Sequence, residues 1–178
     1  MKTMALFFTA FLLSILSPGI YAASERPEAG SDAAVALDYK KDSGERIQAI
    51  QRMATQEEGD AAGALISILL DKAEEQGVRA SAARALGEVR QVGSEVLKAL
   101  SDVFREPGVE PNLRYTILMS IGKLKDVSGI SLLKEALAES DPMIRFKAVQ
   151  AMGDLGSAEA VSIISGHLDA EKDKMVRA

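Results

Sequence analysis

The sequence predicts an all-α protein, a right-handed solenoid of antiparallel helical hairpins. Two observations indicate this class. An arginine recurs at a period typical of helical hairpins, and the apolar residues around each copy follow helical spacing on two faces. A hairpin with this many apolar faces can bury them only against neighbouring hairpins, which is how a solenoid is stabilised.

The first segment, residues 1–22, is predicted to be a secretory signal peptide. Lys2 gives it a positive start, and the apolar run over residues 4–16 is too short to span a bilayer comfortably. Small residues follow at Ala22 and Ala23, where we expect cleavage. The protein would then be periplasmic or secreted, without stable membrane insertion; an uncleaved N-terminal anchor is the alternative.

Residues 23–42 are polar and alanine-rich, and we interpret them as a linker that leads into an N-terminal cap. A short helix is expected over residues 32–41. The repeat domain then covers residues 43–178, with about four hairpins and the start of a fifth.

One motif recurs along this domain. The segments "GERIQAIQRMAT", "GVRASAARALGEV", "NLRYTILMSIGKL" and "DPMIRFKAVQAMGDLG" align without internal gaps. Successive arginines of the motif are 33, 35, 31 and 32 residues apart, which is a helical-hairpin period. These arginines are Arg46, Arg79, Arg114, Arg145 and Arg177.

Each copy of the motif is predicted to form the first helix of a hairpin. In the last complete copy, Ile144, Ala148 and Met152 define one apolar face, and Phe146 with Val149 defines a second. A surface helix of a closed globule needs only one such face. Two faces predict contact both with the second helix of the same hairpin and with neighbouring first helices.

A glycine lies eight residues after three of the arginines, at Gly87, Gly122 and Gly153. Glycine costs about 1 kcal/mol against alanine in a helix, so we expect these glycines to allow close helix approach or a bend. Their spacing does not match either glycine motif of phosphate-binding loops.

An acid precedes each arginine by four residues. Asp141 suits a helix N-cap, and Pro142 suits the first helical position after it. We expect each arginine to pair with this acid or with its counterpart in the next repeat, in exposed pairs worth about 0–1 kcal/mol. The five acids are Asp42, Glu75, Glu110, Asp141 and Asp173.

Second helices are predicted at residues 60–75, 94–105, 128–139 and 158–168. In the last of them, Val161, Ile164 and Leu168 are predicted to be buried.

Composition excludes several functions. The chain has no cysteine, which excludes disulfides, thiolate metal sites and cysteine nucleophiles, and its one histidine, His167, cannot form a multi-histidine metal site. A net charge of −5 without a basic cluster gives no reason to expect a nucleic-acid partner. We therefore expect no cofactor, no metal site and no catalytic residue.

The motif resembles the HEAT-like repeat family, particularly the short repeats first known from phycobilisome lyases. The resemblance covers about residues 42–178, through the "VR" pairs at 78–79 and 176–177 and the "ALG" and "MG" endings at 85–87 and 152–153. It implies a HEAT-like superhelix whose second helices line a concave surface that binds another protein. The first copy, which has no glycine at the corresponding position, departs most from the pattern.

The expected function is an exported, non-enzymatic scaffold that binds another protein on its second-helix face. The sequence identifies neither that partner nor its pathway. The alternative is a lyase-like or other enzyme, or an accessory subunit, that acts through this face near His167 with Asp169 or an arginine. The export signal and the lack of a cysteine or histidine cluster argue against carrying over lyase chemistry. The candidate partner-binding residues are Ser67, Asp71, Lys98, Asp102, Lys134, Glu135, Ser162 and Ser165.

The sequence stops a few residues into a fifth first helix, at residues 175–178. Because solenoids need terminal caps, we expect that the natural protein continues, that this end frays, or that it pairs with another molecule, including a second copy of the chain.

Overall fold

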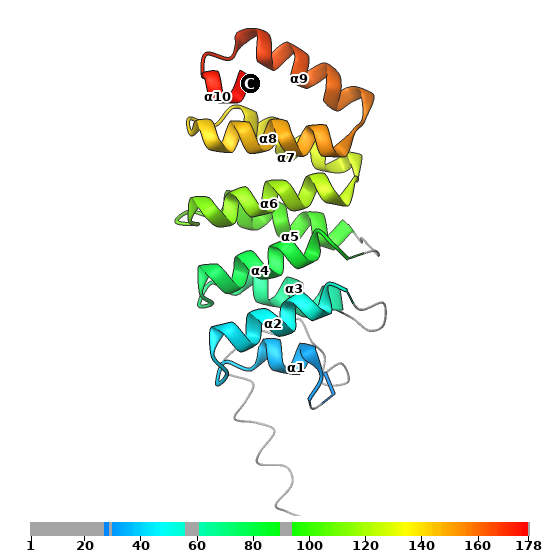
Figure 1. Ribbon diagram of the computed structural model, residues 1–178, viewed down its shortest axis with the longest axis vertical. Helices are drawn as coiled ribbons and strands as arrows, with labels where there is room; N and C mark the ends of the chain where they lie inside the picture. The colour runs from blue at the N-terminus through cyan, green and yellow to red at the C-terminus, as the bar shows by residue number, and fades with distance from the viewer. Residues whose placement is uncertain (1–26, 29, 56–60, 90–93, 178) are drawn as a thin grey trace, which may run out of the picture.

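The computed structural model describes residues 27–28, 30–55, 61–89 and 94–177, and Figure 1 shows their arrangement. Over these residues the chain is entirely helical and has no strand. None of the described helices is long and apolar enough to cross a membrane. The predicted signal peptide lies outside the described residues.

Antiparallel hairpins stack one above the next along the long axis of the molecule, which confirms the predicted α-solenoid (Figure 1). The first helices of the hairpins are α2 (Ser43–Met53), α4 (Gln76–Leu86), α6 (Pro111–Leu124) and α8 (Pro142–Leu155). The second helices are α3 (Ala61–Leu70), α5 (Ser94–Arg105), α7 (Ile130–Leu137) and α9 (Ala158–Ala170). Three short elements complete the stack: α1 (Asp32–Leu37), η1 (Val127–Gly129) and α10 (Lys174–Arg177).

The helix α1 lies within the segment expected to form an N-terminal cap. It packs against α2 and α3 and buries Ala36. It ends at Leu37, four residues before the predicted end, because Asp38 adopts an extended backbone conformation and its carboxylate accepts a hydrogen bond from the Lys40 amide at 3.0 Å. A side chain that bonds to the local backbone in this way favours a turn over a helix.

The predicted N-cap in front of α8 is confirmed. The Asp141 carboxylate accepts a hydrogen bond from the Met143 amide at 2.8 Å, and Pro142 occupies the first helical position. The acids at the same place in front of α4 and α6, Glu75 and Glu110, hold N-cap positions but make no side-chain capping bond. The recurring acid therefore caps some of the helices and not others.

Two second helices are shorter than predicted. The helix α3 ends at Leu70 rather than at residue 75, because the Asp71 carboxylate accepts a hydrogen bond from the Ala73 amide at 2.8 Å and turns the chain. The helix α7 begins at Ile130, after the turn η1, in which Asp126 accepts a bond from the Ser128 amide at 2.9 Å.

Successive first helices approach each other very closely at two of the three recurring glycines. A Cβ atom placed on Gly87 would lie 2.8 Å from the Ser120 Cα, and one on Gly122 would lie 2.8 Å from the Ala151 Cα. Both predictions of close approach are confirmed. Gly153 has no atom within 4 Å of its Cβ position, so close approach is wrong for this glycine, and the alternative of a bend stays a prediction.

The second helices are spaced more widely than the first helices. The pairs α4 with α6 and α6 with α8 are in extensive contact, whereas α5 and α7 scarcely touch. The close contacts between first helices lie at small residues, Gly87 and Gly122. The concave second-helix surface implied by the resemblance stays a prediction.

The predicted inward face of the first helices is confirmed, since Ile144, Ala148 and Met152 are buried. The prediction for the last second helix is wrong at Val161, which is 57% exposed, and Ile164 and Leu168 are only half-buried. The helix α9 lies at the end of the stack, and no described helix covers its outer face (Figure 1).

Candidate functional site

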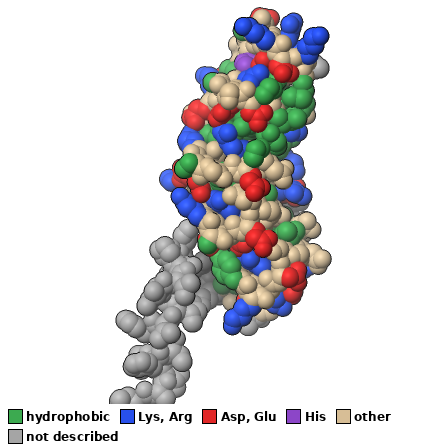
Figure 2. All heavy atoms as spheres, turned by 90° about the vertical axis from the view of Figure 1, so that its left-hand side faces the viewer, with side chains coloured by type: hydrophobic (Ala, Val, Ile, Leu, Met, Phe, Trp, Pro, Cys, Tyr) green, Lys and Arg blue, Asp and Glu red, His purple; other side chains and the backbone are tan. Residues whose placement is uncertain are grey.

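Four of the recurring arginines form ion pairs with acids in the loop that follows the second helix of the same hairpin. We predicted that each arginine pairs with an acid that lies four residues before an arginine of the motif. Each pair is formed instead by a different acid, which lies a few residues earlier in the same loop. Two of the arginines are also buried, so the expectation of exposed pairs is wrong for them. The pairs are Arg46 with Glu74, Arg79 with Glu106, Arg114 with Glu139 and Arg145 with Glu171. Figure 2 shows acidic and basic side chains interleaved along the face of the molecule formed by these loops.

The two buried arginines also bind the backbone of the preceding helix. The Nε atom of Arg46 donates to the carbonyl oxygen of Ala36, and that of Arg79 donates to the carbonyl oxygen of Leu69, each at 2.9 Å and each ten residues earlier in the chain. A buried charge is tolerated only when it is paired and its remaining donors find acceptors. These arginines meet both conditions and fix the position of one helix against the next.

Arg114 departs from this arrangement. Its guanidinium lies over the ring of Phe104, the residue ten positions earlier, with Cζ 4.2 Å from the ring centroid. Its Nε atom is buried and has no hydrogen-bond partner. The contact with the aromatic ring is favourable for a cation, but it leaves unsatisfied a donor that Arg46 and Arg79 satisfy with a carbonyl and Arg145 with the Glu171 carboxylate.

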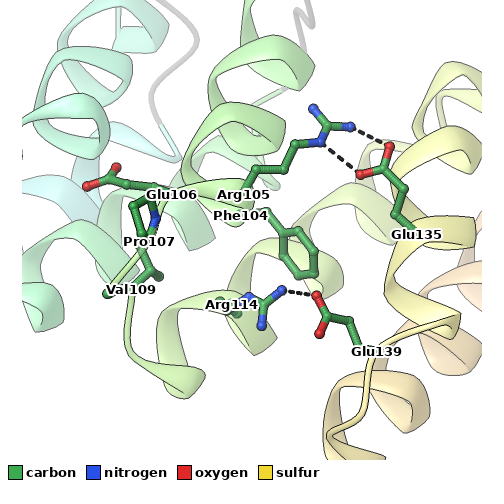
Figure 3. Close-up of a pocket in the computed structure, with 9 residues that line it drawn as sticks. Phe104, Arg105, Glu106, Pro107, Val109, Arg114, Glu135 and Glu139 are labelled. Carbon is green, nitrogen blue, oxygen red and sulfur yellow. Dashed lines mark hydrogen bonds and ion pairs between the residues drawn. The ribbon is translucent and has the colours of Figure 1, made fainter.

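A cavity of about 420 Å³ opens beside Arg114, between the C-terminal ends of α5 and α7 (Figure 3). Its apolar lining comes from Phe104, Pro107 and Val109, and the loop that carries the last two turns at Gly108, whose φ of 81° is in the left-handed region that glycine adopts readily. The cavity follows from the wide spacing of α5 and α7.

Two ion pairs border this cavity. Arg105 donates to both carboxylate oxygens of Glu135 at 2.8 Å, from Nε and from a terminal nitrogen, and Arg114 donates to Glu139 (Figure 3). The hydrogen bonds from Arg105 lower the pKa of Glu135 and raise that of Arg105 itself, so both groups stay charged at neutral pH. The wall of the cavity is therefore largely polar, with Pro107 and Val109 as its accessible apolar part.

The candidate partner-binding residues on α5 and α7 are exposed and form ion pairs. Lys98 and Asp102 pair with each other at 2.6 Å, one helical turn apart on α5. Lys134 lies 3.9 Å from Glu159 of α9, and Glu135 is the partner of Arg105 described above. Of the predicted site residues, only Glu135 lines the cavity.

The remaining candidates lie apart from this region. The Ser67 hydroxyl is buried in α3 without a hydrogen-bond partner, and the half-buried Asp71 accepts a bond from the Tyr39 hydroxyl. Ser162 and Ser165 are exposed on α9, where the Ser165 hydroxyl donates to the Val161 carbonyl at 3.0 Å. The eight predicted residues therefore do not form one cluster.

His167 lies beside the ion pair of Arg145 and Glu171. Its Nε2 atom is 3.1 Å from a carboxylate oxygen of Glu171, and the same oxygen accepts a hydrogen bond from Arg145 at 2.8 Å. Among the residues that the structure describes, no group of histidine, aspartate and glutamate side chains could hold a metal ion. The environment of His167 gives no support to the enzymatic alternative.

Residues 108–178 match the family of HEAT repeats. This match supports the resemblance to HEAT-like repeats, and the earlier hairpins repeat the same helical arrangement. A comparison with curated proteins found no match. HEAT repeats are generally protein-interaction scaffolds and are typically non-enzymatic.

Sequence reasoning missed most of the residues around the cavity. The sequence places Phe104, Arg105 and Glu139 only at the predicted ends of second helices, and Arg114 only in the repeat pattern. One signal was present, because the interval between Arg79 and Arg114 is the longest between successive arginines and contains a proline followed by a glycine. The stacking of a guanidinium on an aromatic ring is a tertiary contact that this signal could not reveal.

Proposed function

We propose that the protein is a non-enzymatic scaffold that binds another protein on its second-helix face, and that it does so after export to the periplasm or the cell exterior. The interaction role is supported by the HEAT-repeat match. Export rests on the apolar N-terminal run and the small residues that follow it.

The observation that carries the choice of face is the cavity between α5 and α7. Partner-binding surfaces contain both apolar and polar groups, and this region offers Pro107 and Val109 beside the exposed pair of Arg105 and Glu135.

The test of this proposal is crosslinking of the protein in its native compartment, followed by mass spectrometry. Reversal of both exposed lysines on the second-helix face, Lys98→Glu with Lys134→Glu, is expected to reduce the yield of a specific crosslinked partner strongly. The matched control is Lys123→Glu, because Lys123 is an exposed lysine on the first helix α6 that also forms an ion pair, with Glu88. Equal loss in both variants, or no loss in either, would contradict the choice of face.

Export is tested separately by the intact mass of the protein recovered from the periplasm or the medium. We expect a chain that begins at Ala23 or Ser24. Recovery of the protein only from the cytoplasm would contradict export. Recovery of only the uncleaved chain would contradict removal of the signal peptide.

A further inference from the structure

We propose that the protein pairs with a second copy of itself through the C-terminal end of the stack, with each α9 antiparallel to its counterpart. This inference goes beyond the scaffold function proposed above, because it concerns a different surface. It follows from the uncovered side of α9, from the opposite charges at the two edges of this end and from the cap at the other end of the molecule.

The outer side of α9 carries apolar residues that no described helix covers. Val161 is 57% exposed, whereas Leu97, at the corresponding place on α5, is 7% exposed and lies against the next hairpin near Gly129. Leu168 is half-buried, and Met175 on the neighbouring α10 is 39% exposed. Association that removes these side chains from water is therefore favourable.

The two edges of this end surface have opposite charge. The turn between α8 and α9 carries two exposed acids, Asp154 and Glu159, and residues 153–160 contain no lysine or arginine. At the opposite edge, formed by the end of α9 and by α10, three exposed cations outnumber one exposed acid, and Figure 2 shows basic side chains gathered there at the upper end of the stack. The residues of this basic edge are Lys172, Lys174, Arg177 and Asp169.

This charge distribution is self-complementary in one arrangement. A two-fold axis that crosses the helices at right angles makes α9 antiparallel to its counterpart and places the acidic edge of each copy against the basic edge of the other. A pairing with parallel helices would bring edges of like charge together, so the antiparallel arrangement is favoured.

Arg177 gives this pairing a second argument. The other four arginines of the motif each pair with an acid 25 to 28 residues later in the chain. Arg177 is exposed and forms no ion pair with any described residue. In the antiparallel arrangement, Asp154 and Glu159 of the second copy supply the carboxylates at this edge.

The N-terminal end of the stack does not offer a matching surface. The helix α1 packs there against α2 and α3 and buries Ala36, and Asp32 of α1 pairs with Arg52 of α2. This cap disfavours head-to-tail association, which would build an open filament, and leaves the closed pair of two C-terminal ends. Both copies then present their second-helix faces on the same side, free for the partner proposed above.

The inference is tested by sedimentation equilibrium of the purified protein at concentrations up to about 500 μM, where we expect a reversible dimer. Two double variants, Asp154→Lys with Glu159→Lys and Lys174→Glu with Arg177→Glu, each place like charges at both contacts. Each is expected to raise the dissociation constant of the dimer at least about tenfold. An equal mixture of the two double variants pairs opposite charges again, so it should form a heterodimer. A wild type that stays monomeric, or a mixture that stays monomeric, would overturn the inference.

The apolar contact is tested with Val161→Asp, which is expected to weaken the dimer at least about tenfold. The control is Val127→Asp, at a valine that is 59% exposed in η1 and away from this end, and it should leave the dissociation constant unchanged. Equal weakening by both variants, or weakening by neither, would overturn the inference. Because Val161 is exposed in the monomer, its replacement should preserve the circular dichroism spectrum and cost little stability in dilute solution. If Val161→Asp does not fold, the mixture of charge variants still decides the test.

Crosslinking of Lys174 in the native compartment identifies the occupant of this end. We expect crosslinks to the region of Asp154 and Glu159 in a second copy. Crosslinks only to another protein, or only to a further hairpin of the same chain, would show a different occupant and overturn the inference.

Discussion

Arg46 and Glu74 form an ion pair in which the side chains are only 5% and 2% exposed, although Arg46 lies on the first helix of a hairpin and Glu74 follows the second. The guanidinium contacts both carboxylate oxygens and also donates to the Ala36 carbonyl, so α1, α2 and the loop after α3 are joined at one point. The same relationship recurs along the stack and ties each hairpin to the loop that leads to the next.

Removal of one partner from this pair is expected to be costly. Glu74→Gln leaves the buried charge of Arg46 uncompensated, and we expect the free energy of unfolding to fall by about 3 kcal/mol or more. Glu88→Gln is the control, because Glu88 and its partner Lys123 are 43% and 46% exposed and such a pair contributes about 0–1 kcal/mol. Urea unfolding followed by circular dichroism measures the free energy of unfolding of both variants. Similar losses of stability in the two variants would contradict the larger contribution expected of the buried pair.

The three recurring glycines should respond differently to alanine. Gly87→Ala and Gly122→Ala place a methyl group 2.8 Å from backbone atoms of the next first helix and are expected to destabilise the protein by about 1–3 kcal/mol. Gly153→Ala meets no atom within 4 Å and lies inside a helix, so we expect stabilisation by up to about 1 kcal/mol. Thermal unfolding of the three variants is the measurement, and a destabilised Gly153→Ala would contradict the open space found beside it.

The C-terminal end of the stack should lose stability in acid. Hydrogen bonds from Arg145 and from the Asp173 amide lower the pKa of Glu171 from 4.5 to about 2. A carboxylate with a lowered pKa contributes stability that is fully present above the pKa of the unfolded chain and is lost as the pH falls toward the folded value. We therefore expect the contribution of Glu171 to disappear between about pH 4.5 and pH 2.

This pH dependence is measured as the difference in unfolding midpoint between the wild type and Glu171→Gln across that range. The difference should be present at pH 6 and shrink toward pH 2. Asp169→Asn, at an exposed acid near the end of α9, is the control and should leave the acid response of the wild type unchanged. A difference that is constant with pH would contradict the role assigned to the Glu171 charge.

Two equivalent positions on second helices should differ in their tolerance to truncation. Leu97 on α5 is 7% exposed, whereas Val161, at the corresponding place on α9, is 57% exposed. Leu97→Ala is expected to cost about 2–3 kcal/mol, and Val161→Ala less than about 0.5 kcal/mol. Chemical denaturation of the two variants tests this, and a large loss for Val161→Ala would show that another surface covers α9 in solution.

Much of the architecture was predictable because it depends on local pattern. Helical spacing of Ile144, Ala148 and Met152 defined the inward face, and the Asp141 and Pro142 pair marked a helix start. The cavity was not predictable, since it depends on how far α5 and α7 stand apart and on which group Arg114 contacts. Both are set by packing between hairpins.

The sequence by itself determined the all-α class and the repeat with its period, because both follow from a local pattern that recurs from one hairpin to the next. Only the tertiary structure decided which acid each arginine pairs with, which glycines are in close contact and where a cavity opens. These outcomes depend on residues about 25 to 35 positions apart, such as Arg114 with Glu139 and Gly87 with Ser120, whose distance is set by the stacking of one hairpin on the next. Similar copies of the motif therefore make different contacts along the stack, since each copy meets a different neighbour.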